Sequence, residues 1–297
     1  MPTTRLLRAL LIAGAFPLVA AAQDRVDTTL AIARDGLVDL GNVSGEIRVS
    51  ASDRRDVRIV ASMERGRFEL SASETRIGLR TRSVGNRQSS ATIEVQVPIG
   101  TRVTASTVSG LVEVRGTQAE VVAKSVSGRV DVRGARNRLD VETVSGTLDL
   151  RDVQGRMDIE GVSTDIELDQ AVGEVTAETV SGSVRIRRSR LSGLRAEAVS
   201  GTITYEGNLD ANGSYRMNTH SGSITLTLPV DVGARLELET FSGRISSDFP
   251  LTLQPGQSTG RGRRMEFTLG NGGARVTAGA FSGNITIRRG SAAGDRE

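Results

Sequence analysis

The stretch Val126-Ser127-Gly128-Arg129-Val130-Asp131-Val132 holds the unit on which most of the chain is built. The tripeptide Val-Ser-Gly, or a close variant, recurs through the 297 residues. Its serines are Ser109, Ser127, Ser145, Ser163, Ser181, Ser200, Ser221 and Ser242, spaced by 18, 18, 18, 18, 19, 21 and 21 residues. Such a fixed short period predicts a repeat architecture. A further step of 40 residues leads to Ser282, which we interpret as two repeats, one of them without a marker.

Apolar and polar residues alternate within each repeat. The third and fifth residues after a marker serine are apolar, as at Val130 and Val132, and so are the twelfth and fourteenth, as at Leu139 and Val141. Period-two alternation directs one set of side chains inward and the other into water. We therefore predict an all-β fold, a single-chain β-solenoid with β-helix-like rungs of 18–21 residues. Each rung would contain two short strands and two turns, stacked about 4.8 Å from the next rung.

The marker itself is predicted to form a corner of each rung. Its valine would fill the interior, its serine would bond to nearby backbone, and its glycine would permit a positive φ or a close backbone approach. The turn residues predicted in this way are Ser109, Gly110, Ser127, Gly128, Ser145, Gly146, Ser181, Gly182, Ser200, Gly201, Ser221, Gly222, Ser242, Gly243, Ser282 and Gly283. After residue 200 the rungs lengthen, and the larger residues Tyr205 and Phe241 are predicted to fill a wider interior.

The ends of the sequence depart from the repeat. Residues 1–22 combine two early arginines, an apolar run and a closing Ala-Ala-Ala, which is typical of a cleaved secretory signal peptide. A membrane anchor is the alternative, but the run is short and Pro17 interrupts it. We assign residues 23–100 to an irregular, mostly antiparallel β region that caps the solenoid, residues 101–290 to the repeats, and residues 291–297 to a polar tail.

Composition and charge narrow the functional classes. The sequence has no cysteine, which excludes disulfides, thiolate metal sites and a cysteine nucleophile. Without the two arginines of the predicted signal peptide, 36 basic residues (38 less 2) face 35 acidic ones, so we expect no nucleic-acid partner. No second apolar run is long enough to predict a transmembrane segment in the mature chain. Residues 254–264 break the alternation and predict a surface loop, with a small cluster of arginines.

Few residues are candidates for chemistry. His220 is the only histidine; we expect it partly buried at a corner, and a zinc site or a catalytic triad there is not predicted. A column of stacked acids could bind calcium or act as paired carboxylates on a polysaccharide. Its members are Glu142, Glu160, Glu178 and Glu197. We predict no catalytic residue, no cofactor-binding residue and no cofactor.

A second acidic column has its own basic partners. Its members are Glu113, Asp131, Asp149 and Glu167. In the first three of these rungs an arginine follows two residues later, for example Arg133 after Asp131. We therefore expect acid and arginine to neutralise each other on a solvated face, with each exposed pair contributing little to stability.

The units Thr107-Val108-Ser109-Gly110, Thr143-Val144-Ser145-Gly146 and Thr179-Val180-Ser181-Gly182, with the ending Phe281-Ser282-Gly283-Asn284-Ile285, carry a resemblance. Over roughly residues 35–290 the chain resembles the bacterial putative-adhesin family of exported β-solenoid domains. The resemblance implies a β-solenoid at the cell envelope or surface, and it carries over no catalytic residue.

We expect a non-enzymatic exported protein, periplasmic, cell-surface or secreted, that acts as an adhesin or interaction scaffold. Its partner would be an envelope or surface protein or a glycan. Two alternatives stay open: an envelope-stress or regulatory binding partner, and a polysaccharide-active β-helix enzyme. The regulatory alternative is not separated from adhesion by the sequence, whereas the enzyme requires clustered acids with aromatic platforms.

Overall fold

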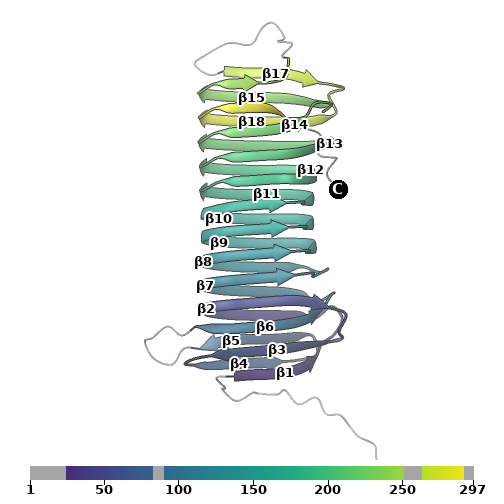
Figure 1. Ribbon diagram of the computed structural model, residues 1–297, viewed down its shortest axis with the longest axis vertical. Coiled ribbons are helices and arrows are strands. Elements are labelled where there is room, and N and C mark those ends of the chain that lie inside the picture. Colours follow the sequence, from purple (N-terminus) through teal and green to yellow (C-terminus); the bar gives the residue numbers. More distant parts are fainter. Residues whose placement is uncertain (1–24, 83–89, 251–262, 291–297) are drawn as a thin grey trace, which may run out of the picture.

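A computed structural model describes residues 25–82, 90–250 and 263–290, which form one tall stack of strands (Figure 1). All nineteen elements of this part of the chain are strands, which confirms the predicted all-β solenoid. None of these residues forms a helix of the length and apolarity that crossing a bilayer requires. The predicted signal peptide (1–22) and polar tail (291–297) lie outside the described residues.

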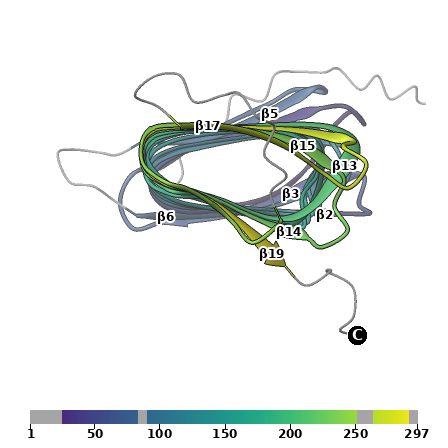
Figure 2. The ribbon, with the colours of Figure 1, turned by 90° about the horizontal axis from the view of Figure 1, so that it is seen from above.

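The strands of the central rungs pair in parallel, and the marker of each rung lies directly above the marker of the rung below. These strands are β7 (Arg102–Arg115), β8 (Val121–Arg133), β9 (Arg136–Arg151), β10 (Gln154–Asp169), β11 (Val172–Ser181), β12 (Val184–Ser200) and β13 (Ile203–Ser221). Ser109 pairs with Ser127, and Ser127 with Ser145. Seen from above, the rungs trace a flattened oval with two long sides (Figure 2). The side formed by the residues that precede each marker serine, such as 139–142 before Ser145, is called the pre-marker sheet. The side formed by the residues that follow it, such as 130–133 after Ser127, is called the post-marker sheet.

The interior is filled as the alternation predicts. Val130, Val132, Val141 and Leu150 are all fully buried, and Leu139 is nearly so. Hydrophobic burial of these layers stabilises the stack, because a single rung has too few apolar side chains to offset the entropy of ordering its backbone.

The longer rungs enclose two tyrosines. Tyr205 and Tyr215 are buried with their ring centroids 5.7 Å apart at 64°. The hydroxyl of Tyr205 donates to the carbonyl of Asn208 at 2.7 Å, so the polar end of this buried ring is satisfied. Burial raises the pKa of both phenols. The prediction of bulky filling is confirmed at Tyr205.

The predicted inward orientation of the marker valine is wrong. The valines are between 46% and 50% exposed from Val108 to Val199, and Phe241 is 48% exposed. The residue before the valine is buried instead in all these rungs except that of Val162, for example Thr107 and Thr143. Neighbours in a strand point to opposite sides, so an inward threonine forces the valine outward.

The threonine also takes the hydrogen-bonding role predicted for the marker serine. Thr107 Oγ1 donates to the carbonyl of Ser109 at 3.3 Å, and Thr143 Oγ1 donates to the carbonyl of Ser145 at 3.4 Å. Within the described residues no marker serine uses its hydroxyl in a hydrogen bond. The corner is therefore held by the threonine side chain and the serine backbone.

The marker glycine bends the strand without ending it. Gly128 has a φ of 141°, and β8 continues through it. A Cβ added at Gly128 would lie 2.0 Å from the carbonyl oxygen of Gly110 in the rung below. Both the backbone angle and the contact require glycine.

The sequence predicts a second turn in each rung but does not identify its residues. This second corner lies seven residues after each of the five markers from Ser109 to Ser181, where the backbone turns through the left-handed region. The residues there are Gly116, Gly134, Asp152, Gln170 and Arg188, with φ between 48° and 75°. Three of the five are not glycine, so the sequence carries no clear signal for this bend.

The stack begins inside the segment assigned to the N-terminal cap. Strand β2 (Leu37–Ser52) is already a rung, because Ser44 and Gly45 pair with Ser109 and Gly110 of β7. On its other edge β2 pairs in parallel with β5 (Arg76–Arg82) and β6 (Ala91–Pro98). Antiparallel pairs then add β1 (Arg25–Ala31), β3 (Asp56–Met63) and β4 (Arg67–Ala72). The repeat becomes regular near residue 101, but the solenoid starts with β2.

At the C-terminal end the order in space differs from the order in sequence. The strands here are β14 (Ile224–Pro229), β15 (Ala234–Ser242), β16 (Ile245–Ser247), β17 (Arg263–Leu269), β18 (Ala274–Ser282) and β19 (Ile285–Gly290). Strand β18 lies between β13 and β15 (Figure 1). Strand β19 pairs with β14 on one edge and with β16 on the other. Ser282 therefore stacks between Ser221 and Ser242.

This arrangement corrects two expectations. The 40-residue step does not contain a rung that has lost its marker; it contains β16, the segment 251–262, which lies outside the described residues, and β17. The predicted loop 254–264 extends too far, because Arg263 and Arg264 begin β17. Strand β17 pairs antiparallel with β15 and covers the last edge of the stack.

The two corners are expected to respond differently to side chains. Gly128→Ala should destabilise the protein by at least about 3 kcal/mol, because the methyl group meets a carbonyl and the backbone angle is strained. Gly134→Asn is the control, since it has a φ of 67° and no atom nearer than 3.5 Å to an added Cβ. It should cost at most about 1 kcal/mol. Urea unfolding followed by circular dichroism measures both; equal costs would contradict the assigned roles of the corners.

Removal of residues 274–297 tests the intercalated rung. Strand β15 pairs with β17 and β18, and β16 pairs with β19, so the deletion separates both from the stack. We expect residues 234–247 to lose protection in hydrogen exchange while β8 to β10 keep it. Unchanged protection of β15 in the shortened chain would contradict the strand order.

Candidate interaction surface

The outward marker residues form a continuous column along one corner of the stack. In order along the stack these are Val108, Val126, Val144, Val162, Val180, Val199, His220, Phe281 and Phe241, which we call the valine–aromatic ladder. The eight apolar members are each about half exposed, and His220 is exposed too. The expectation of a partly buried His220 is therefore wrong.

Three stacked rings close the C-terminal end of the ladder. The centroid of Phe281 lies 4.8 Å from that of His220 and 4.9 Å from that of Phe241, with 4° between the planes in each pair. Phe281 occupies this central place because β18 lies between β13 and β15. Both faces of its ring therefore lie against another ring, and its edges face the solvent.

The predicted glutamate column lies beside the ladder on the pre-marker sheet. Each glutamate stands two residues before its ladder valine, with a buried position between them at Thr143 and Thr179. Glu142 pairs in register with Glu160, Glu160 with Glu178, and Glu178 with Glu197. The structure thus places all four candidate glutamates in one column along the stack.

Three of the four glutamates have ion pairs. Glu142 accepts from Lys124 at 2.6 Å, and this hydrogen bond raises the pKa of the lysine. Arg195 contacts Glu197 at 2.8 Å and Glu178 at 3.6 Å. Glu160 is exposed and has no ion pair within the described residues. Every member of the column except Glu160 therefore has a basic partner.

The glutamates do not form a preorganised metal site. In residues 25–82, 90–250 and 263–290, no group of three or more acidic, histidine or cysteine side chains is placed to hold a metal ion. Lys124 and Arg195 occupy part of the hydrogen-bonding capacity of Glu142, Glu178 and Glu197.

A groove runs between the ladder and the glutamate column. Two hollows of about 510 Å³ each lie along it and meet at Glu160 and Gly161. Gly161 stands at the inward position that Thr143 and Thr179 occupy in the neighbouring rungs, and an added Cβ there would lie 2.7 Å from the Cβ of the buried Thr164. With four glutamates and Lys124, the residues that line the two hollows carry a net charge of −3 with neutral histidine. We call this feature the ladder groove.

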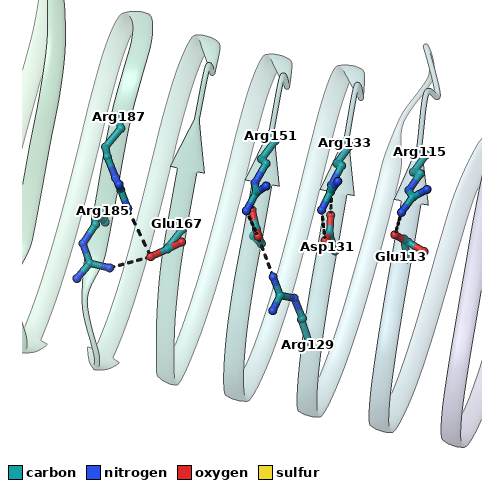
Figure 3. Close-up of polar contacts among 10 residues, drawn as sticks. Glu113, Arg115, Arg129, Asp131, Arg133, Arg151, Glu167, Arg185 and Arg187 are labelled. Atoms are coloured by element: carbon teal, nitrogen blue, oxygen red, sulfur yellow. Dashed lines mark hydrogen bonds and ion pairs between the residues drawn. The ribbon is translucent and has the colours of Figure 1, made fainter.

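The post-marker sheet presents a different surface of paired charges (Figure 3). Arg133 makes two bonds to Asp131, at 2.8 and 2.9 Å, within one strand. Asp149 accepts from Arg151 at 2.7 and 2.6 Å and from Arg129 at 2.9 Å. The prediction that acid and arginine neutralise each other is confirmed. The aspartates are not on a solvated face, however, because the side chains of Asp131 and Asp149 are only 8% and 7% exposed beneath the arginines.

Asp149→Asn should therefore destabilise the protein more than an exposed pair would suggest. Loss of the charge weakens bonds to two arginines in a covered position, at a cost of about 1–3 kcal/mol. Glu167→Gln is the control, since Glu167 pairs with Arg185 at 2.9 Å but its side chain is 44% exposed. Its cost should stay under about 1 kcal/mol. Thermal unfolding of both variants measures the difference, and equal costs would show that cover by arginine has no energetic effect.

Comparison with known proteins finds two similar solved structures and one protein family. A putative cell adhesion protein from Clostridium sporogenes is 10% identical, with 90% of this chain and 100% of that chain covered and a TM-score of 0.24. A putative adhesin from Bacteroides fragilis is 13% identical, with 89% and 96% covered and a TM-score of 0.42. No curated protein matches the chain. The model of the family described as Toastrack DUF4097 matches residues 45–288, and the chain belongs to this family.

Proposed function

We propose that this protein is an exported, non-enzymatic envelope or surface protein that acts as an adhesin-like interaction scaffold. The observation that carries the proposal is the valine–aromatic ladder, in which eight apolar side chains stand about half exposed in one continuous file. Soluble proteins rarely leave contiguous apolar surface in water unless that surface binds something. Export rests on the signal-peptide pattern of residues 1–22.

The scaffold is suited to binding because it is rigid before the partner arrives. The ladder residues lie on strands that are paired to a rung on either side through most of the stack, over a filled interior. Association therefore orders little of this protein, and more of the contact energy remains as affinity. A periodic surface also offers the same contact repeatedly along its length.

The groove supports binding better than polysaccharide cleavage. Three of its four glutamates are engaged with Lys124 or Arg195. A sugar stacks on the face of an aromatic ring, yet both faces of Phe281 lie against other rings. An envelope-stress or regulatory partner could use the same ladder, since that role differs from adhesion in the location of the partner and not in the chemistry of contact.

The proposal predicts that binding depends on the ladder. The double variant Val144→Ser, Val162→Ser should reduce binding of the labelled mature protein to intact cells or isolated envelopes by about fivefold or more. Val230→Ser is the control, because Val230 is 67% exposed but lies outside the ladder. Bound fluorescence measures the effect, with thermal unfolding to confirm that each variant is folded.

Two results would contradict the proposal. One is undiminished envelope binding by the folded ladder variant. The other is hydrolysis of an envelope polysaccharide that is abolished by Glu160→Gln, which would favour the enzyme.

A further inference from the structure

We infer that the ladder groove binds a basic amphipathic α-helix of a partner polypeptide. The inference rests on the proposed function, since it names the class of partner that the scaffold would hold. The apolar stripe of the helix would pack on the ladder valines, and its lysines or arginines would face the glutamate column. The core of the site is the junction of the two hollows, at Val144, Val162, Glu160 and Gly161.

Charge selects a cationic partner. The residues lining the groove carry −3, and Glu160 at its centre has no ion pair within the described part of the chain. A lysine or arginine placed beside Glu160 would gain a partner without breaking an existing pair. The acidic column would repel an anionic polysaccharide, a nucleic acid or an anionic headgroup, because like charges brought together are unfavourable.

The rung spacing selects a helix over an extended strand. Stacked rungs repeat at about 4.8 Å, whereas a helix repeats at about 5.4 Å per turn and a strand presents one face about every 6.7 Å. Over the three steps from Glu142 to Glu197, a helix laid along the groove drifts by about 2 Å and a strand by about 6 Å. Flexible lysine and arginine side chains accommodate the smaller drift.

A second copy of the chain in antiparallel order fits the groove less well. If two ladders face each other in antiparallel order, a two-fold axis brings the glutamate column of one copy against that of the other. This contact sets acid against acid in a partly dehydrated interface. A helix that supplies both apolar and basic side chains avoids the conflict.

The test uses a labelled amphipathic peptide and the whole mature protein. The probe is a capped helix of about 18 leucine and lysine residues, with leucine at positions i, i+3, i+4 and i+7. Two comparison peptides have glutamate in place of lysine, or the same leucines and lysines in scrambled order. Fluorescence anisotropy gives the Kd of each peptide for the wild type and for Glu160→Lys, Val162→Ser and Glu206→Lys.

We expect saturable binding of the leucine–lysine helix, weakened about tenfold by Glu160→Lys and by Val162→Ser. Glu206→Lys should change the Kd by less than about twofold. This control makes the same charge change at an exposed glutamate of the post-marker sheet, which also has no ion pair within the described residues. Added salt should weaken the binding.

Three outcomes overturn the inference: no saturable binding of the leucine–lysine helix, equal binding of the glutamate or scrambled peptide, or equal effects of Glu160→Lys and Glu206→Lys. The envelope-binding assay reports separately on the scaffold. If the ladder variant loses envelope binding while the leucine–lysine helix fails to bind, the scaffold stands and the helical partner is refuted. Dimerisation that Val162→Ser abolishes, with no helix binding, assigns the groove to a second copy and refutes the inference.

Discussion

The close approach of backbone to backbone at the marker corner is the constraint on which the rest of this structure depends. A Cβ at Gly110, Gly128 or Gly146 would lie about 2 Å or less from a carbonyl oxygen in the rung below. Glycine accommodates this approach, and the marker glycines stack directly over one another except in β10, where Thr164 stands over Gly146. Register is thereby fixed at one point per rung, and period-two alternation carries it along both sheets.

The same constraint creates the exposed ladder. Strand β9 passes through the corner without interruption, so the alternation continues through Thr143 and Val144 up to the bend, which begins at the exposed Ser145. Thr143 points inward, where it bonds to the corner backbone, and Val144 must point outward. Because every rung has the same register, the exposed valines align in one file and the glutamates two residues earlier align in another. A surface groove thus follows from a requirement of the interior.

Most of the fold could be predicted from the sequence because period and alternation are local signals. The orientation of the marker valine could also have been found. Leu139 and Val141 point inward, so counting in steps of two assigns Thr143 to the interior and Val144 to the solvent. Hydrophobicity favoured the opposite assignment. The second corner gave no such signal, because Asp152, Gln170 and Arg188 hold a left-handed backbone there without glycine.

The candidate groove could be predicted only in part, because it depends on long-range order. The stacked glutamates followed from counting residues, but their place beside an exposed apolar ladder required the outward orientation of the marker valines. The aromatic end of the ladder depends on the position of β18 in the stack. The step of 40 residues between marker serines does not indicate with which strands β18 pairs. By entering between β13 and β15, β18 brings together His220, Phe281 and Phe241 from three separate segments. The ladder therefore reaches its full length only when the C-terminal rung has docked, so its binding surface depends on completion of the fold.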